Sequence, residues 1–448
     1  MLPSLLAYRD AAERLRRNVG LTTQDLDAQR LGRFRELVRH AQQHSACYAT
    51  ILRERGIRAE TCVPGDFPVL TKRLLREHFD AIATDARITH AAISEFLADS
   101  PDPGELYLDE YVVLHTSGTS GEVGCVVYSG ADWARGMAGM ARVSVPDPRR
   151  IAFVGATGGH HAGVSFALAA RLLPRSAVEV LTIDIHRPIG DMIRELHAFQ
   201  PDVLAGYPSG TRWLAEAQRD GRLRIRPRSI QCSGEALRPD EQASFEAAFG
   251  CPCVNVYAST ETMLIGVART GDPAMTLLDD DLIIEPAGDH VLVTNLNSRA
   301  LPLIRYRLDD AVRLTGRPAP SGPYRTIEPV VGRSEGGPTF RTAEGTLETL
   351  SAHVINEIFV PGVARFQMRV ADEHTFRFLV CLDPGAGGSS GAGAGPGSRA
   401  VALTRARLQA ILEEKGLGNV RFTVEVTGEL PVDPASGKVR LIVPPTRR

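Results

Sequence analysis

The sequence predicts an α/β protein with a large N-terminal domain of layered sheets and helices and a small α+β domain at the C-terminus. Three observations carry this prediction. Helical periodicity dominates residues 1–100, and from residue 110 short β-rich runs alternate with helical stretches. After Gly332 the composition changes again. Because strands that alternate with helices favour a largely parallel sheet, we expect the middle of the chain to form the core of the large domain.

The N-terminal region, residues 1–100, is predicted to be helical. Apolar side chains recur every three or four residues over 24–44 and 70–79. Threonines stand near the start of both stretches, at Thr22-Thr23 and at Thr71. Their hydroxyl groups can cap the free backbone N–H groups of a first helical turn.

The central region is predicted to supply the main sheet. Strands are expected over 111–115, 151–155, 178–183, 203–206, 229–232 and 253–257, and helices over 162–173, 190–199, 209–219 and 240–248. A further β-rich segment, 281–296, is interrupted by Pro286-Ala-Gly-Asp289 and is predicted to form a hairpin.

The C-terminal domain is expected over residues 335–448, after a large domain that covers residues 1–334. Its predicted elements are strands over 364–371, 375–382 and 420–426 and a helix over 402–415. Residues 384–398 contain only Gly, Ser, Ala and Pro, which predicts a flexible surface loop because such a segment buries little apolar surface. Gly387-Gly-Ser-Ser-Gly391 formally matches a hydrolase nucleophile motif, but a low-complexity loop is the wrong context for that strand-turn-helix motif.

Composition excludes several classes of protein. With 43% hydrophobic and 23% charged residues in 448, the chain is neither disordered nor fibrous. A formal net charge of −2 without a Lys/Arg cluster argues against a nucleic-acid partner. The N-terminus lacks a signal pattern and no stretch approaches the roughly 18–20 apolar residues of a membrane span, so we expect a cytoplasmic protein with no membrane partner. The oligomeric state is not encoded in any pattern, and a dimer is compatible with the sequence.

Seven cysteines are scattered along the chain, and we expect all of them to be free thiols. Cys251-Pro-Cys253 is the one close pair, and no second Cys or His cluster stands nearby to complete a metal site. We therefore predict no structural zinc.

A string of small hydroxyl-bearing residues and glycines follows the first predicted strand: Thr116, Ser117, Gly118, Thr119, Ser120 and Gly121. Such a loop lets backbone N–H groups and hydroxyls surround an anion, so it is a candidate phosphate-binding loop. A Walker loop would end in Gly-Lys-Ser/Thr, and this string does not. A plain Ser/Gly surface turn is the alternative.

Four further strings follow in a fixed order. They are Tyr257-Ala-Ser-Thr260-Glu261, Tyr306-Arg-Leu-Asp-Asp310, Gly332-Arg-Ser-Glu335 and Pro434-Ala-Ser-Gly-Lys438. Together with the loop, this set resembles the motifs of the adenylate-forming acyl-CoA ligases. The N-terminal strings Leu31-Gly-Arg-Phe-Arg-Glu-Leu-Val-Arg-His-Ala41, Cys47-Tyr48 and Phe67-Pro-Val-Leu-Thr-Lys72 are similar to the opening of phenylacetate-CoA ligases and their coenzyme F390 synthetase-like relatives.

This resemblance implies an AMP-forming ligase that uses ATP and Mg²⁺. A carboxylic acid, expected to be aryl or arylalkanoic, would be activated as an acyl-adenylate and passed to CoA, with release of AMP and pyrophosphate. The alternatives within the superfamily are an amide ligase and an ATP-dependent diazotase that activates nitrite for an aryl amine. A non-catalytic nucleotide-binding homologue and an ADP-forming phosphotransferase are alternatives of other classes, and the latter is disfavoured by the missing Walker lysine.

The resemblance also implies roles for individual residues. The loop Thr116–Gly121 would hold the β- and γ-phosphates, Glu261 the Mg²⁺ ion, and Thr260 the α-phosphate. Tyr257 would stack on adenine beside Ala258 and Ser259, and Ala258 replaces the glycine usual in the motif. Asp310 and Arg333 would bind the ribose or a phosphate, Glu335 would be the hinge of the C-terminal domain, and Lys438 would approach the reacting groups from it.

Three more strings are candidate walls of the acid and nucleotide pockets. Gly159, His160 and His161 lie where relatives have an aromatic or histidine side chain beside the carboxylate, and we expect one of the two histidines to face the site. Ser233, Gly234 and Glu235 resemble a Gly-Glu string near adenine, and Tyr207 and Pro208 follow a predicted strand. Ordinary strand-to-helix turns are the alternative for the last two strings.

Overall fold

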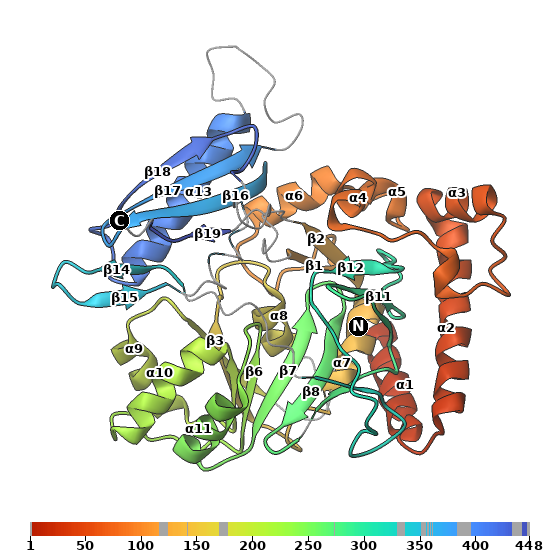
Figure 1. Ribbon diagram of the computed structural model, residues 1–448, viewed down its shortest axis with the longest axis horizontal. Coiled ribbons are helices and arrows are strands. Elements are labelled where there is room, and N and C mark those ends of the chain that lie inside the picture. The colour runs from red at the N-terminus through yellow and green to blue at the C-terminus, as the bar shows by residue number, and fades with distance from the viewer. Residues whose placement is uncertain are drawn as a thin grey trace.

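The computed structural model describes most of the chain. The described residues are 2–115, 124–140, 142–169, 178–272, 274–328, 337–350, 355, 358, 360, 362–382, 396–431 and 441–445. A broad α/β body carries helices along one side, and a smaller sheet with one long helix stands above it (Figure 1).

The N-terminal region is helical, as predicted. Thr22 caps α2 by accepting a hydrogen bond from the backbone N–H of Asp25, and Thr71 caps α4 in the same way through Leu74. The predicted helix over 70–79 is split, because His78 leaves the helical conformation with φ −118° and ψ 19° and separates α4 from α5. The elements are α1 (Leu2–Asn18), α2 (Thr23–His44), α3 (Ala46–Arg55), the 3₁₀ turn η1 (Pro64–Asp66), α4 (Lys72–Glu77), α5 (Phe79–Ile82) and α6 (His90–Asp99).

An eight-stranded sheet forms the centre of the molecule, in the order β13-β9-β8-β7-β6-β5-β3-β4. Strands β4, β3, β5, β6 and β7 run parallel, which confirms the predicted largely parallel sheet, and β8, β9 and β13 extend it with antiparallel pairs. The bounds are β3 (Arg150–Gly155), β4 (Glu179–Asp184), β5 (Val203–Gly206), β6 (Ser229–Ser233), β7 (Cys253–Ser259), β8 (Met263–Arg269), β9 (Met275–Leu277) and β13 (Thr326–Ile327).

Helices cover the two faces of this sheet unequally. Buried side chains of α9 (Ile189–Phe199), α10 (Pro208–Arg219) and α11 (Pro239–Phe249) pack with those of the parallel strands in one core cluster. The helix that follows β3, α8 (Ala162–Ala169), contributes Val164 to a different cluster, beside Phe153. In the sheet, β3 lies between β4 and β5. After β3 the chain continues to β4 toward one end of the sheet, and after β5 it continues to β6 toward the other end. The sheet order therefore reverses between these two strands.

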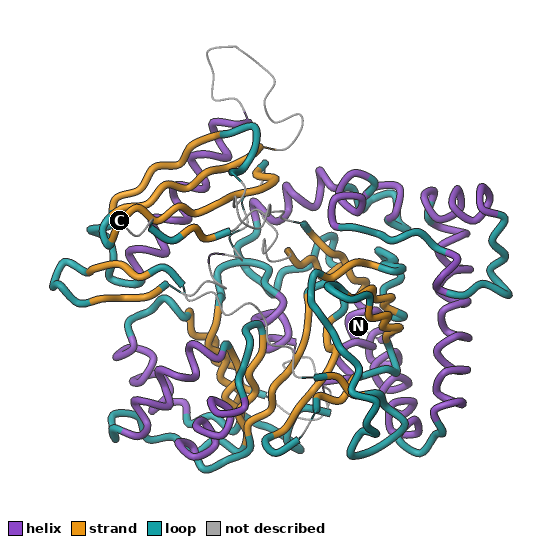
Figure 2. Tube along the Cα trace, in the orientation of Figure 1, coloured by secondary structure: helices purple, strands orange, loops and turns teal. Residues whose placement is uncertain are grey.

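Two small antiparallel sheets flank the main one (Figure 2). The first pairs β1 (Tyr111–His115) with β2 (Cys125–Ser129), which leads into α7 (Gly130–Met140). The second holds β10 (Leu282–Pro286), β11 (Val291–Asn295) and β12 (Tyr306–Leu308), and the β10–β11 hairpin confirms the turn predicted at 286–289.

The C-terminal part forms its own sheet, in the order β18-β17-β16-β19, with a hairpin of β14 and β15 beside it. Its long helix begins at Pro396, earlier than the predicted residue 402, so residues 396–398 of the predicted loop 384–398 are helical. Proline fits the first turn of a helix because its missing N–H has no partner there. Residues 384–395 lie outside the described residues. The elements are β14 (Thr339–Arg341), β15 (Leu347–Thr349), β16 (Val363–Asp372), β17 (Thr375–Leu382), α13 (Pro396–Glu414), β18 (Arg421–Val426) and β19 (Ile442–Val443).

Candidate active site

The candidate site lies along the carboxyl ends of the parallel strands. Four of the strings singled out in the sequence follow those ends: Gly159–His161 after β3, Tyr207-Pro208 after β5, Ser233–Glu235 at β6 and Thr260-Glu261 after β7. Parallel strands bring their carboxyl ends to one edge of a sheet, and ligands of open α/β sheets bind at that edge, where the strand order reverses. The reversal between β3 and β5 therefore coincides with the predicted pocket walls.

Gly206 shows why one of these turns is a glycine. It ends β5 with φ +150°, and a Cβ atom there would come within 2.1 Å of the carbonyl oxygen of Val154 on β3. Only glycine permits this approach of two backbones. Tyr207 then turns inward, and its buried ring packs edge-on against Phe153 at 6.1 Å between centroids.

Glu261 is buried in the turn between β7 and β8, with 7% of its surface exposed. The hydroxyl of Tyr306 on β12 donates to Glu261 Oε1 at 3.0 Å, and the side-chain amide of Asn295 on β11 donates to the Glu261 carbonyl at 3.2 Å. Tyr128 on β2 donates to the carbonyl of Thr260 at 2.8 Å. Three different strands therefore hold this turn in place.

Backbone strain accompanies this carboxylate. Met263 and Arg305 adopt φ values of 63° and 51°, in the left-handed region that non-glycine residues rarely occupy. They stand beside the two partners of the Tyr306–Glu261 hydrogen bond. A Cβ at Gly136 of α7 would lie only 1.8 Å from Met263 Sδ, so the helix presses closely on this segment. Strain of this kind persists where the surroundings fix the backbone, as they do at functional sites.

A second hydrogen bond joins the same two strings, Tyr257–Glu261 and Tyr306–Asp310. The hydroxyl of Tyr257 on β7 donates to Asp310 Oδ2 at 2.8 Å. Burial and the neighbouring Asp310 carboxylate raise the pKa of Tyr257, so the phenol keeps its proton. Residues 53 positions apart in sequence thus meet in one hydrogen bond.

Glu235 connects two of the predicted pocket strings. Its Oε2 accepts from the backbone N–H of Ser209 at 2.8 Å, and its Oε1 accepts from the Ser209 hydroxyl at 2.9 Å. Ser209 is the second residue of α10, which begins at Pro208 directly after Tyr207. A carboxylate at this position also complements the positive N-terminal end of the helix.

His160 is held on both sides by protein groups. Its Nδ1 lies 3.1 Å from the Val113 carbonyl and its Nε2 lies 3.2 Å from the Ser100 hydroxyl, while its ring packs on Phe96. Burial lowers the pKa of His160. One of the two histidines was predicted to face the site, and His160 has the contacts of a structural residue.

His161 lies against a histidine that the sequence did not single out. Its ring is 4.1 Å from that of His115, the last residue of β1, and both side chains are buried. Burial, together with His161, His160 and Arg407, lowers the pKa of His115 well below its usual value. The signal for His115 was its place directly before the candidate phosphate loop.

Arg407 reaches this histidine cluster from the C-terminal helix α13. A Cβ at Gly158 would lie 2.8 Å from Arg407 Nη1, so the guanidinium rests directly on the turn after β3. A contact between a β3 turn and a residue 249 positions later is invisible to local sequence patterns.

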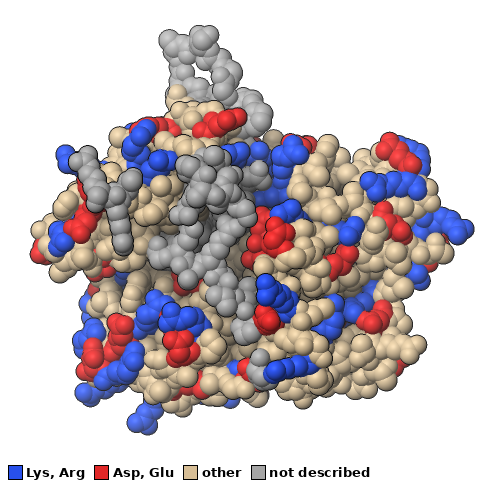
Figure 3. Space-filling model, in the orientation of Figure 1, with Lys and Arg blue, Asp and Glu red and all other residues tan. Residues whose placement is uncertain are grey.

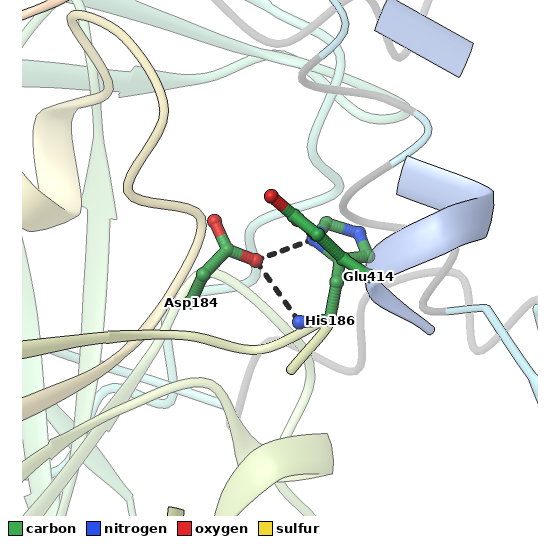
Figure 4. Close-up of side chains that lie close together, drawn as sticks. All are labelled: Asp184, His186 and Glu414. Atoms are coloured by element: carbon green, nitrogen blue, oxygen red, sulfur yellow. Dashed lines mark hydrogen bonds and ion pairs between the residues drawn. The ribbon is translucent and has the colours of Figure 1, made fainter. Parts of the chain in front are cut away.

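Two further side chains of this helical region, Glu414 and Lys415, contact the segment after β4 and helix α10. Glu414 Oε2 lies 3.9 Å from His186 Nδ1, which in turn lies 2.5 Å from Asp184 Oδ1 at the end of β4 (Figure 4). Asp184, His186 and Glu414 offer one His nitrogen and two carboxylate oxygens within 4.8 Å of one another, a donor set that could hold a metal ion. Lys415 Nζ lies 3.9 Å from the centre of the Trp213 ring on α10.

Several predicted site residues lie outside the described residues. They are the phosphate-loop residues Thr116–Gly121, Arg333, the hinge residue Glu335 and Lys438. Their roles stay predictions.

The fold and the site define a class, which a family model identifies. The model described as "AMP-binding enzyme" matches residues 40–282, more than half of the chain. The protein belongs to the AMP-binding enzyme family. The matched residues include strands β1 to β9 and the turns at the carboxyl ends of the parallel strands, as far as Glu261.

Two relatives are similar over part of their length. The phenylacetate-coenzyme A ligase of Pseudomonas putida is 28% identical over 261 residues, which are 51% of this chain and 56% of that protein. Protein CapK of Staphylococcus aureus is 27% identical over 128 residues, which are 27% of this chain and 28% of that one. The matched regions thus span about half or less of each relative.

Solved structures share the fold over nearly the whole chain. A 2-hydroxyisobutyryl-CoA ligase in the postadenylation state aligns with a TM-score of 0.58 at 18% identity, covering 96% of this chain and 91% of that one. The same ligase with 2-HIB-AMP and CoA in its thioesterification state gives a TM-score of 0.55 at 19% identity, with the same coverage.

Basic and acidic side chains are interspersed over the face seen in Figure 3. Among the described residues, no helix combines the length and the apolar character that crossing a bilayer requires.

Proposed function

We propose that this protein uses ATP to activate a carboxylic acid as an acyl-adenylate and then transfers the acyl group to the thiol of CoA. The observation that carries the proposal is the meeting of two hydrogen-bonded pairs, Glu261 with Tyr306 and Tyr257 with Asp310, at the carboxyl edge of the sheet of an AMP-binding enzyme. An aryl or arylalkanoic acid is proposed because one relative is named a phenylacetate-coenzyme A ligase.

The reaction consists of two substitutions. A carboxylate oxygen of the acid attacks the α-phosphorus of ATP, and pyrophosphate leaves. The sulfur of CoA, after losing its proton, then attacks the acyl carbon of the mixed anhydride, and AMP leaves. Both steps gather negative charge on phosphate oxygens, so the protein has to position the reactants and offset that charge.

Glu261 fits the role of a Mg²⁺ ligand. A carboxylate is the hard oxygen donor that this ion prefers, and Tyr306 occupies only one of its two oxygens among the described contacts. Bound Mg²⁺ neutralises part of the triphosphate charge. Tyr306 fixes the orientation of the carboxylate, and Thr260, whose carbonyl is tied to Tyr128, would turn toward the α-phosphate.

Asp310 and Tyr257 suit the nucleoside. The carboxylate of Asp310 can accept hydrogen bonds from ribose hydroxyls, while the Tyr257 phenol holds it in place and presents its ring to adenine. Ala258, Ser259, Ser233, Gly234 and Arg333 complete this proposed nucleotide pocket.

The acid pocket is proposed between the β3 and β5 turns. Tyr207, Pro208 and Gly159 would form its walls, with His161 beside the substrate carboxylate and His160 supporting the turn. Since His115 stays neutral near pH 7, an imidazole N–H in this cluster can donate to a carboxylate without carrying a full charge.

The C-terminal domain is proposed to act as a mobile lid after residue 334, with Glu335 as hinge and Lys438 as the cation that approaches the α-phosphate during adenylation. The contacts of α13 with the large sheet would belong to one of its positions.

The test is AMP and pyrophosphate formation by the purified protein, with a panel of aryl acids and with nitrite plus aryl amines, each with and without CoA. Acid-dependent AMP that increases on adding CoA, with acyl-CoA as product, is the expected result. AMP that forms without a CoA effect, or only with nitrite, would overturn the proposed acceptor, and no AMP with any substrate would overturn the adenylation itself.

A further inference from the structure

A cavity of about 280 Å³ lies between α1, α2, α7 and the segment that follows β11, on the side of the molecule where these helices stand together (Figure 1). No residue of the candidate active site lines it. Its charged lining consists of five arginines and two carboxylates: Arg14, Arg17, Arg33, Arg135, Arg299, Asp10 and Glu36. We call it the arginine pocket.

Two of these arginines are fixed by one carboxylate. Arg14 Nη2 and Arg33 Nη1 both lie close to Asp281 Oδ1, at 2.6 and 2.7 Å. Arg33 also donates to the Asp280 carbonyl and to Asn297 Oδ1, each at 2.7 Å. Asp281 contacts two guanidinium groups, and its single negative charge balances only one of their two positive charges.

The opposite wall is fixed by Asp132 at the start of α7. Its Oδ1 accepts from Arg135 at 3.2 Å, and its Oδ2 accepts from the backbone N–H groups of Arg299 and Ala300 at 3.0 Å each. This buried carboxylate therefore holds both α7 and the segment that carries Arg299. The walls of the pocket are preorganised, which lowers the entropy that a ligand loses on binding.

Two arginines of the pocket have only long contacts with carboxylates, 3.9 Å from Arg17 to Glu13 and 3.9 Å from Arg299 to Glu36. Burial lowers the pKa of Arg33 and of Arg135, and repulsion from neighbouring arginines contributes: Arg14 and Arg135 act on Arg33, and Arg299 and Arg14 act on Arg135. Arg14 Nη1 is buried, and among the described residues it has no hydrogen-bond partner. A bound anion would relieve this repulsion.

We propose that the arginine pocket binds a phosphate group, either as free phosphate or as the terminal phosphate of a small monoester. Guanidinium forks pair with phosphate oxygens in parallel hydrogen bonds, and five of them converge here. Because each water takes up about 30 Å³ in the liquid, the cavity has room for a phosphate with an organic substituent. This site is separate from the proposed function and does not depend on it.

The experiment is calorimetric titration of the full-length protein with inorganic phosphate and, separately, with glycerol 3-phosphate, at constant ionic strength because exposed charges are screened by salt. The test variant is Arg17→Gln/Arg299→Gln, since these lining side chains are 72% and 41% exposed and their loss should spare the fold. The control is Arg16→Gln, an exposed arginine of the same helix that does not line the pocket.

We expect the double variant to weaken binding at least about tenfold, while the control binds like the wild type and all three proteins keep the same circular dichroism spectrum. Tighter binding of glycerol 3-phosphate would assign the site to a monoester, and tighter binding of inorganic phosphate would assign it to the free ion. Equal affinity of the wild type and the double variant would place the phosphate elsewhere, for instance at the Thr116–Gly121 loop, and would overturn the proposal. So would the absence of wild-type binding at millimolar concentrations.

Discussion

At the scale of single residues, the candidate site depends on buried polar pairs that connect distant segments. The Glu261 carboxylate lies in a turn that the sequence motif already marked, but Tyr306, which orients it, comes from another motif on another sheet. Met263, two residues after Glu261, and Arg305, directly before Tyr306, both have a strained backbone. The motifs at 257–261 and 306–310 therefore form one structural unit, so finding both in the sequence was more informative than finding either alone.

Glu261→Gln should lower AMP formation by roughly 100-fold or more, because the amide cannot replace a carboxylate as ligand and charge partner of Mg²⁺. Tyr306→Phe should have a smaller effect, about tenfold, since it removes one hydrogen bond to a charged group and leaves the carboxylate. The measurement is AMP release as a function of Mg²⁺ concentration.

The control for this pair is Glu425→Gln on β18, which removes an exposed carboxylate paired with Arg377. It should leave AMP formation unchanged. If Glu261→Gln retained wild-type activity at every Mg²⁺ concentration, the metal-ligand role of Glu261 would be wrong.

At the scale of elements, helix α13 and the residue after it dock on the carboxyl edge of the large sheet. Arg407, Ile411, Glu414 and Lys415 recur at spacings of four, three and one along this face. Ile411 belongs to the core cluster that also contains Phe153 and Tyr207, so apolar packing joins the C-terminal sheet to the large one. The charged contacts surround this apolar centre.

The Lys415–Trp213 contact offers a test of this docking. Lys415→Met keeps the apolar stem and removes the ammonium group, and a double-mutant cycle with Trp213→Leu should give a coupling of about 0.5–2 kcal/mol in the free energy of unfolding. The same substitution should change Trp213 fluorescence, because the cation lies 3.9 Å from the ring centre.

As a matched pair, Lys415→Met combined with Arg212→Ala should show no coupling, since Arg212 on α10 pairs with Glu241 instead. A Lys415–Trp213 coupling of zero would mean that the docked position of α13 is not populated in solution.

At the scale of the whole molecule, folding buries titratable groups that prefer to be charged in water. His115 and His160 both have a lowered pKa in the folded state, with burial as the first cause. These histidines therefore take up protons near pH 6.5 in the unfolded chain, but only at a lower pH in the folded protein. Their contribution to the free energy of unfolding is fully present above pH 6.5 and decreases as the pH falls below it.

The expected result is a lower free energy of unfolding at pH 5.5 than at pH 7.5, by up to about 1.4 kcal/mol per histidine and pH unit over this range. Urea denaturation at both pH values measures it. His160→Asn should reduce the pH dependence whatever its effect on absolute stability, and His374→Asn, which removes an exposed histidine, serves as the comparison. An unchanged pH dependence in His160→Asn would contradict the assignment.

The sequence alone determined much of this protein. Short β-rich runs between helical stretches predicted the five parallel strands to within one or two residues, because strand propensity is a local property of the side chains. The run at 111–115 was also predicted as a strand of this sheet, but it pairs with β2 in a separate sheet, which no local pattern could show. The ordered motifs predicted the family, which the family model confirms. Threonine caps at Thr22 and Thr71 followed from the local chemistry of a helix start.

Only the tertiary structure decided which residues meet. The reversal of strand order between β3 and β5, the pairing of Tyr306 with Glu261 and the approach of Arg407 to Gly158 all join segments far apart in the chain. No local pattern distinguishes His160, enclosed by Ser100 and Val113, from its neighbour His161. The arginine pocket was likewise invisible, because its five arginines come from three helices and a loop, and their charges gather only when the chain is folded.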